Sequence, residues 1–281
     1  MSEPPVEADR LRVLAEANPQ ATLALAEVLR SSPRDVTVGL TLESFAYSTL
    51  LGGREFARWL DERGARPLPS SANCAPVLVD RAEGTLQITL NRPERRNAYG
   101  RELRDALVES LRLALLDNGI TRIVLDGQGP SFCSGGDLDE FGTTPDLATA
   151  HFVRTSAGAG RLLHRLADRI EVRLQGSCIG AGIELPAFAG RVFAEPGTTF
   201  RLPEVSMGLI PGAGGTVSIP HRIGRWRTFY LALSGCVLAA ETVLQWGLVD
   251  AIREGGRDGL LRRDLASSRD GPVACRAVSW R

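Results

Sequence analysis

The sequence has few cysteines, and none of them lies in a C-x-x-C pair. Five cysteines, an odd number, are scattered through 281 residues. This usage argues against a disulfide framework or a zinc site, and it is typical of a cytoplasmic protein with free thiols. We therefore expect a cytoplasmic location and no metal.

The sequence also lacks an excess of either charge and lacks long apolar runs. Lys plus Arg and Asp plus Glu both number 33, so the net charge is zero. Binding to nucleic acid or to an anionic membrane would call for a basic excess. No apolar run reaches about eighteen residues, and the N-terminus has no basic-then-apolar signal. We expect neither nucleic acid nor a membrane as a partner.

The first 64 residues are expected to form a mainly helical extension. Apolar residues recur at helical spacing in four stretches: 7–17, 21–29, 43–51 and 54–63. Residues 35–42 are rich in β-branched side chains and indicate a short strand. We expect the extension to pack on the main domain or on another subunit. The alternative is an arm that covers a ligand.

A linker over residues 65–76, rich in Pro and Ser, precedes the main domain, which spans 77–252. Residues 253–281 form a short polar tail. Within 77–252, strands and helices alternate, which predicts an α/β fold. Strands are expected at 77–80 and 86–90, which form a β-hairpin around Glu83 and Gly84, and at 123–126, 170–174 and 192–194. Helices are expected at 101–116, 147–166, 182–188, 214–221, 225–233 and 239–246.

Glycine-rich segments dominate the chain between residues 130 and 216. They are Ser131–Leu138, Gly176–Leu185 and Leu202–Thr216. Glycine lets the backbone approach a ligand closely and leaves N–H groups free to point at it. Two acids, Glu184 and Glu204, lie in otherwise apolar or small-residue surroundings. Backbone donors beside two shielded carboxylates can hold a carbonyl and move protons next to it.

Four segments together resemble the crotonase superfamily, the enoyl-CoA hydratase/isomerase family. They are Leu90–Ala98, Phe132–Asp137, Gly180–Leu185 and Pro203–Thr216, and the resemblance runs from about Val77 to Ile252. It implies the crotonase fold, a spiral of repeated β-β-α units, here with an N-terminal helical extension. It also implies a homo-oligomer, a trimer or a hexamer, and a role in fatty acid metabolism.

The resemblance implies an acyl-CoA thioester as substrate, with coenzyme A as part of that substrate and no other cofactor. The N–H groups of Gly136 and Ala181 would form an oxyanion hole. Ala181 lies just before an expected helix, so its N–H belongs to the positive end of that helix. Residues expected to bind the substrate or its CoA are Arg95, Arg96, Asn97, Ala98, Ser134, Gly135, Asp137 and Leu138.

Retention of both glutamates favours a hydro-lyase, an enoyl-CoA hydratase or the reverse dehydratase. Glu204 would protonate the α-carbon of the thioester, and Glu184 would orient and activate water. A structural interpretation also stands, in which Glu184 caps its helix and Glu204 is a solvated loop acid. The alternative functions are isomerisation or thioester hydrolysis on the same scaffold, or a non-catalytic relative that binds CoA esters or a protein.

Overall fold

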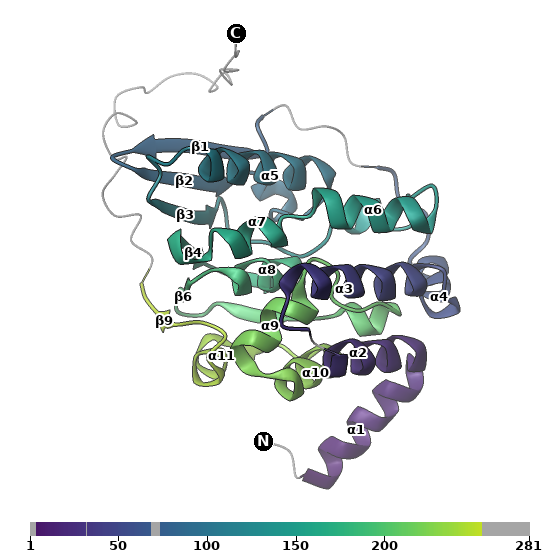
Figure 1. Cartoon of the computed structure of the whole chain (residues 1–281). Coiled ribbons are helices and arrows are strands. Elements are labelled where there is room, and N and C mark those ends of the chain that lie inside the picture. The colour runs from purple at the N-terminus through teal and green to yellow at the C-terminus, as the bar shows by residue number, and fades with distance from the viewer. Residues whose placement is uncertain (1–3, 32, 69–73, 255–281) are drawn as a thin grey trace.

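A six-stranded sheet forms the centre of the computed structural model, which describes residues 4–31, 33–68 and 74–254 (Figure 1). Its strands, in spatial order, are β1 (Val77–Ala82), β2 (Thr85–Leu90), β3 (Arg122–Gly127), β4 (Ile170–Leu174), β6 (Arg191–Ala194) and β9 (Ala251–Ile252). All neighbours run parallel except β1 and β2. The apolar run Ile123–Leu125 of β3 suits a parallel strand that is covered on both faces, whereas β4 alternates apolar residues with Glu171 and Arg173.

The antiparallel pair is the predicted hairpin. Its turn consists of Glu83 and Gly84, with φ angles of 46° and 77°. Two positive φ angles are the signature of a tight hairpin turn, which sets the register of β1 on β2. The expected hairpin is confirmed.

A second, three-stranded sheet was not predicted. It contains β5 (Ser177–Ile179), β7 (Thr199–Arg201) and β8 (Leu238–Ala239). Strands of two or three residues are too short to show a period in the sequence. Strand β5 lies within the second glycine-rich segment, so this small sheet helps to position that segment.

Eleven α-helices surround the sheets in the described part of the chain. The first four are α1 (Pro4–Ala17), α2 (Pro19–Ser31), α3 (Val36–Leu51) and α4 (Arg54–Arg63). The others are α5 (Arg101–Leu116), α6 (Leu147–Ala157), α7 (Gly160–Arg165), α8 (Ala181–Glu184), α9 (Gly215–Ile223), α10 (Arg225–Ser234) and α11 (Ala240–Trp246). Short 3₁₀ helices are η1 (Pro93–Arg95), η2 (Leu138–Glu140), η3 (Ala167–Arg169), η4 (Pro186–Phe188) and η5 (Glu204–Met207).

Two expectations about these helices were wrong. The β-branched residues 36–42 open α3 instead of forming a strand, because Asp35 caps the helix by accepting hydrogen bonds from the N–H groups of Thr37 and Val38. The expected helix 147–166 is two helices that are separated at Gly158. A Cβ at Gly158 would lie 2.4 Å from the carbonyl oxygen of Arg154, so the chain passes too closely there for another residue type.

The N-terminal helices pack on the rest of the chain, and Figure 1 shows α3 beside α6 and α9. Their buried side chains belong to the same continuous core as the sheet residues. Burial of this kind is the main source of stability for such helices, because short helices are marginal alone. Members of the core from this region are Ala21, Leu25, Val28, Leu29, Val36, Leu50 and Phe56.

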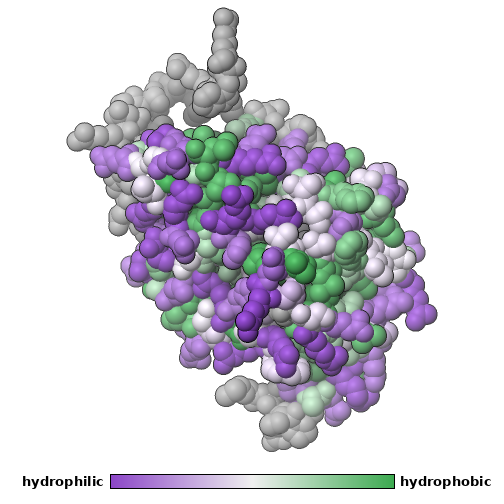
Figure 2. All heavy atoms as spheres, in the orientation of Figure 1, coloured by the Kyte–Doolittle hydropathy of each residue, from purple (hydrophilic) through white to green (hydrophobic). Residues whose placement is uncertain are grey.

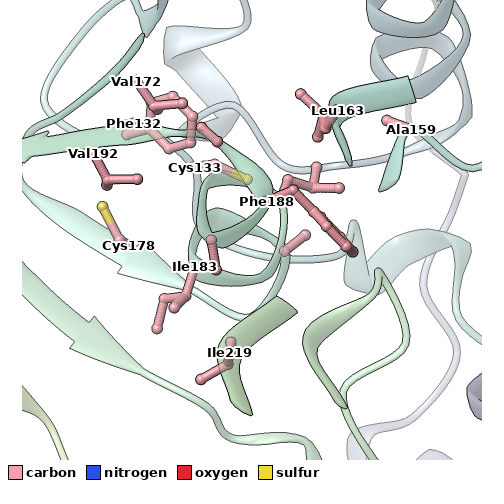
Figure 3. Close-up of a cluster of buried hydrophobic side chains, with 14 of the residues drawn as sticks. Phe132, Cys133, Ala159, Leu163, Val172, Cys178, Ile183, Phe188, Val192 and Ile219 are labelled. Carbon is pink, nitrogen blue, oxygen red and sulfur yellow. The ribbon is translucent and has the colours of Figure 1, made fainter. Parts of the chain in front are cut away.

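The core surrounds α8, and Figure 3 shows Ile183 of this helix among the buried side chains. Cys133 and Cys178 lie in the same cluster as free thiols, and burial raises the pKa of the Cys133 thiol to about 12. A thiol with such a pKa stays protonated and acts as a small apolar side chain. These two cysteines are therefore structural.

On the surface, hydrophobic residues occur in small groups that are separated by hydrophilic ones, as the face in Figure 2 shows. No helix among the described residues is both long enough and apolar enough to cross a membrane. The linker is described at residues 65–68 and 74–76, and the tail at residues 253 and 254 only, so the expectation of a short polar tail lies almost wholly outside the described residues.

Candidate active site

The first two glycine-rich segments lie against each other. Cys133 and Cys178 form an isolated parallel bridge, and the N–H of Ile179 donates to the carbonyl oxygen of Cys133 at 3.1 Å. A Cβ at Gly182 would lie 2.3 Å from that same carbonyl oxygen. Glycine is required there because no side chain fits between the two backbones.

This packing brings the expected oxyanion donors into neighbouring segments. Gly136 is bridged to Tyr99, and Ala181 is the first residue of α8. Among the described residues, neither the N–H of Gly136 nor that of Ala181 donates a hydrogen bond. Helix α8 has only four residues, so the helix dipole adds little and the free N–H groups themselves are the available donors.

Glu184, the last residue of α8, is only 2% exposed. One of its carboxylate oxygens, Oε2, accepts hydrogen bonds from the N–H groups of Ala213 at 2.7 Å and Gly215 at 2.9 Å. Burial raises the pKa of Glu184, and the nearby Glu204 and Glu43 raise it further, while the two N–H groups oppose this effect. Glu184 is held rigidly and is not solvated.

Glu204, the first residue of η5, reaches the same region from the third segment. Its Oε2 is buried and has no hydrogen-bond partner among the described residues. Its Oε1 occupies space beside Gly180, where a Cβ would lie 2.5 Å away. Burial raises the pKa of Glu204 to about 7. Its own backbone N–H lowers this value, but among the described residues no N–H from another segment donates to it, in contrast to Glu184.

Sequence reasoning missed a third glutamate, Glu43 of α3, which is 2% exposed. Its two oxygens accept hydrogen bonds from the N–H of Gly214 at 2.8 Å, and from the N–H and the hydroxyl of Thr216 at 2.9 and 2.7 Å. Burial raises the pKa of Glu43 to about 7. One signal could have found it: Glu43 is the only charged residue within Val36–Leu51.

Two further side chains complete this cluster. The guanidinium of Arg154 lies 4.5 Å from the ring centroid of Tyr47 and donates hydrogen bonds to the hydroxyls of Ser44 and Ser48. The ring of Tyr47 lies against Gly212, where a Cβ would be 2.3 Å from Cε2. Helix α3 thus contributes polar groups to the region around the two expected glutamates.

The residues expected to bind CoA fall into two adjoining strips, 95–98 and 134–138. The N–H of Ser134 donates to the carbonyl oxygen of Arg96, and the N–H of Tyr99 donates to that of Gly135. Ala98 is half-buried, and Leu138 opens η2. The strips therefore form one surface, which their backbone bonds hold in place.

The side chains of this surface differ in whether they are already bonded within the protein or are free to bind a ligand. Arg95 donates to Asp137 at 2.6 Å and to Asp139 at 2.8 Å, and this guanidinium lowers the pKa of the Asp139 carboxyl. Asn97 is fully buried, and its amide bonds the backbone of Arg92, Gln128 and Ser131. Arg96 is exposed, and its side chain has no hydrogen bond or ion pair among the described residues. Arg96 is the cation of this strip that can receive an anion.

A cavity of about 190 Å³ opens beside this surface. Its lining contains three of the expected residues, Arg95, Ala98 and Asp137, together with two further arginines, Arg92 and Arg101. Neither Glu184 nor Glu204 lines it. The cavity is therefore separate from the glutamate cluster, and its three arginines are matched by three acids, Glu102, Asp137 and Glu140.

Comparison with known proteins identifies the family. The family model described as enoyl-CoA hydratase/isomerase matches residues 80–262. The chain is 32% identical over 204 residues to the 2,3-dehydroadipyl-CoA hydratase of Escherichia coli K12, an alignment that covers 72% of this chain and 79% of that protein. It is 35% identical over 178 residues to the 1,2-epoxyphenylacetyl-CoA isomerase of the same organism, with 62% and 68% covered.

Solved structures of enoyl-CoA hydratases are also similar to this chain. An enoyl-CoA hydratase from Mycobacterium smegmatis superposes with a TM-score of 0.59 at 27% identity, covering 64% of this chain and 70% of that one. An enoyl-CoA hydratase from Thermoplasma volcanium gives 0.58 at 30% identity, with 64% and 73% covered. The expected crotonase fold is confirmed. The chain therefore belongs to the enoyl-CoA hydratase/isomerase family, whose members act on acyl-CoA thioesters.

Proposed function

We propose that this protein is a hydro-lyase that adds water to the double bond of a 2-enoyl-CoA thioester, or removes it in the reverse direction. The observation that carries the proposal is the contrast between two neighbouring acids. Glu184 receives two backbone N–H groups, whereas the Oε2 of Glu204 is buried without a partner. Hydration needs one group that accepts a proton and one that gives a proton, and the contrast supplies both.

The hydrogen bonds favour negative charge on Glu184 and the proton on Glu204. All three glutamates have raised pKa values, so the cluster carries protons near neutral pH. N–H donors stabilise a carboxylate, and a buried carboxyl without donors retains its proton. In the starting state, Glu184 therefore orients water and Glu204 holds the proton.

The proposed reaction proceeds through an enolate. As Glu184 takes a proton from water, the water oxygen forms a bond to C3 of the acyl group. The electrons of the double bond move to the thioester oxygen, where the N–H groups of Gly136 and Ala181 stabilise the negative charge. Glu204 then gives its proton to C2. The proton on Glu184 passes to Glu204 and restores the starting state.

We propose that the arm of coenzyme A lies along the strips 95–98 and 134–138. Arg96 is the side chain free to pair with a phosphate, because Arg95 is already bonded to two aspartates. Asn97 supports the strip through backbone contacts from inside the fold. The reaction requires acid–base groups and the CoA of the substrate, and no further cofactor.

Turnover of a panel of 2-enoyl-CoA thioesters tests the proposal. Wild type is compared with Glu184→Gln and Glu204→Gln, and Glu55→Gln serves as a matched control. Glu55 is also 2% exposed and also accepts two backbone N–H bonds, but from the first turn of α2. We expect kcat to fall by about 10²–10⁴ in each site variant and to change little in the control.

The second candidate is double-bond isomerisation, which the 31% identity over 206 residues to the enoyl-CoA isomerase/hydratase fer4 of Mycosarcoma maydis favours. Isomerisation moves a proton and adds no water. Product analysis in ¹⁸O-labelled water separates the two reactions, because only hydration introduces the label at C3. If the protein binds the thioesters but forms neither the hydrated nor the isomerised product, both proposals are wrong.

A further inference from the structure

Two carboxylates share one short backbone segment, Ala213–Thr216. Glu184 accepts the N–H groups of Ala213 and Gly215, and Glu43 accepts those of Gly214 and Thr216. The four donors thus alternate between a glutamate of α8 and a glutamate of α3. They are the N–H groups at the start of α9, which have no acceptor within that helix.

The alternation couples the two glutamates mechanically. Consecutive peptide planes in Ala213–Thr216 share a Cα, and each plane presents its N–H to a different carboxylate from the next. A rotation that frees Gly214 or Thr216 from Glu43 therefore reorients the donors that hold Glu184. The backbone at Gly215 is packed directly against the Glu184 side chain, because a Cβ there would lie 2.6 Å from Cγ of Glu184.

We propose that Glu43 is a positioning residue of the active site, which fixes Ala213–Thr216 and thereby the carboxylate of Glu184. This inference rests on the proposed function for its kinetic consequence. Under this proposal, α3 contributes a residue to the active site. The family match begins at residue 80, so the N-terminal helices supply this group from outside the matched region.

The contacts of Glu43 go beyond those of a simple helix cap. A cap needs one oxygen acceptor on a short side chain such as Ser, Asp or Asn. Glu43 is instead a fully buried acid that comes from another helix, 171 residues away in sequence from Gly214. Glu55 provides the comparison, because it also caps a helix from a distant element, and among the described residues no hydrogen bond joins it to the backbone donors of Glu184 or to Glu204.

Charge couples Glu43 to the site as well. The titratable or charged side chains that act on Glu43, Glu184 or Glu204 come from several elements: Tyr47, Tyr99, Cys133, Arg154 and Arg201. The negative charge of Glu43 is one of the groups that raise the pKa of Glu184.

The test compares Glu43→Gln with Glu55→Gln in the full chain. The glutamine places an NH₂ group against the N–H of either Gly214 or Thr216, two donors face to face. We expect kcat to fall by about 10- to 100-fold in Glu43→Gln, as for other misplaced catalytic groups, with KM within about threefold. We expect Glu55→Gln to stay within about threefold of wild type in kcat.

A second readout does not depend on turnover. The amide ¹H resonances of Ala213 and Gly215, whose N–H groups donate to Glu184, are expected to shift in Glu43→Gln and to stay in place in Glu55→Gln. Thr216→Val provides a milder variant if Glu43→Gln does not fold, because it removes only the hydroxyl donor to Glu43. We expect it to lower kcat by about threefold to tenfold.

The outcomes separate the two proposals. Equal kcat values for Glu43→Gln and Glu55→Gln, or unchanged amide resonances of Ala213 and Gly215 in Glu43→Gln, overturn the positioning role. If the wild-type protein binds thioesters but converts none of them, the proposed function is wrong. The positioning role is then decided by the amide resonances alone.

Discussion

The Oε1 of Glu204 occupies the space that a side chain at position 180 would fill, because a Cβ on Gly180 would lie 2.5 Å from it. Gly180 also has a φ angle of 50° and precedes Ala181, whose N–H is free. One glycine therefore serves both the acid and the expected oxyanion donor. We therefore expect a substitution at Gly180 to affect catalysis as well as stability.

Gly180→Ala is expected to lower kcat by at least about tenfold, because the new methyl group displaces the Glu204 carboxyl. It also places alanine at φ 50° and ψ −117°, a region that favours glycine, which costs about 1–3 kcal/mol of stability. Gly197→Ala is the control, since Gly197 has a φ of 78° and a Cβ there meets nothing within 4 Å. Kinetic assays and thermal unfolding of both variants check this. Equal loss of kcat in the two variants contradicts the assignment of Gly180.

Gly212→Ala is expected to destabilise the fold by about 1–3 kcal/mol through overpacking. The added Cβ would lie 2.3 Å from Cε2 of Tyr47, so α3 must move away from the Pro211–Thr216 segment. Denaturant unfolding of Gly212→Ala, Tyr47→Leu and the double variant measures the effect. The double variant is expected to lose less stability than the sum of the two single variants, because Tyr47→Leu removes the ring that the new Cβ meets. If the two losses simply add, the contact does not have this effect.

Stability is expected to fall as the pH rises from about 4.5 to about 7. Burial raises the pKa of Glu204 from 4.5 to about 7, so the unfolded chain loses this proton at a lower pH than the folded chain. Below pH 4.5 both states hold the proton, and between the two values ionisation favours the unfolded state. Glu204→Gln removes this contribution of about 1–3 kcal/mol. Thermal unfolding against pH should be flatter for Glu204→Gln, and an identical slope would count against the buried acid.

Arg95 and Arg96 are expected to behave differently despite being neighbours. Arg95→Ala leaves the buried Asp137 without its ion-pair partner and costs about 2–3 kcal/mol of stability. Arg96→Ala is expected to change stability by less than about 0.5 kcal/mol, because the side chain is exposed and unpaired among the described residues.

For Arg96→Ala we expect KM for an enoyl-CoA to rise about tenfold, because an arginine–phosphate contact is lost. KM for the matching enoyl-pantetheine thioester, which lacks the nucleotide phosphates, should stay the same. Steady-state kinetics with both substrates measure this. A rise for both substrates places Arg96 elsewhere than at the phosphates.

Local pattern determined most of the fold. The sequence predicted the hairpin at Glu83–Gly84, helix 101–116 and strand 170–174, because turn residues and apolar periodicity are local properties. It also identified the family through four ordered segments, and the family match confirms that identification. The choice of Glu184 and Glu204 came from those segments and stays a prediction.

Tertiary structure decided what the local pattern could not. Residues 36–42 form a helix because Asp35 caps it and α6 and α9 cover it, which overrides their β-branched character. Glu43 comes to the site because α3 packs on α9, a contact between residues 171 or more positions apart. Sequence fixes which residues prefer a helix or a turn, whereas the packing of distant helices decides which buried acids share the same backbone donors.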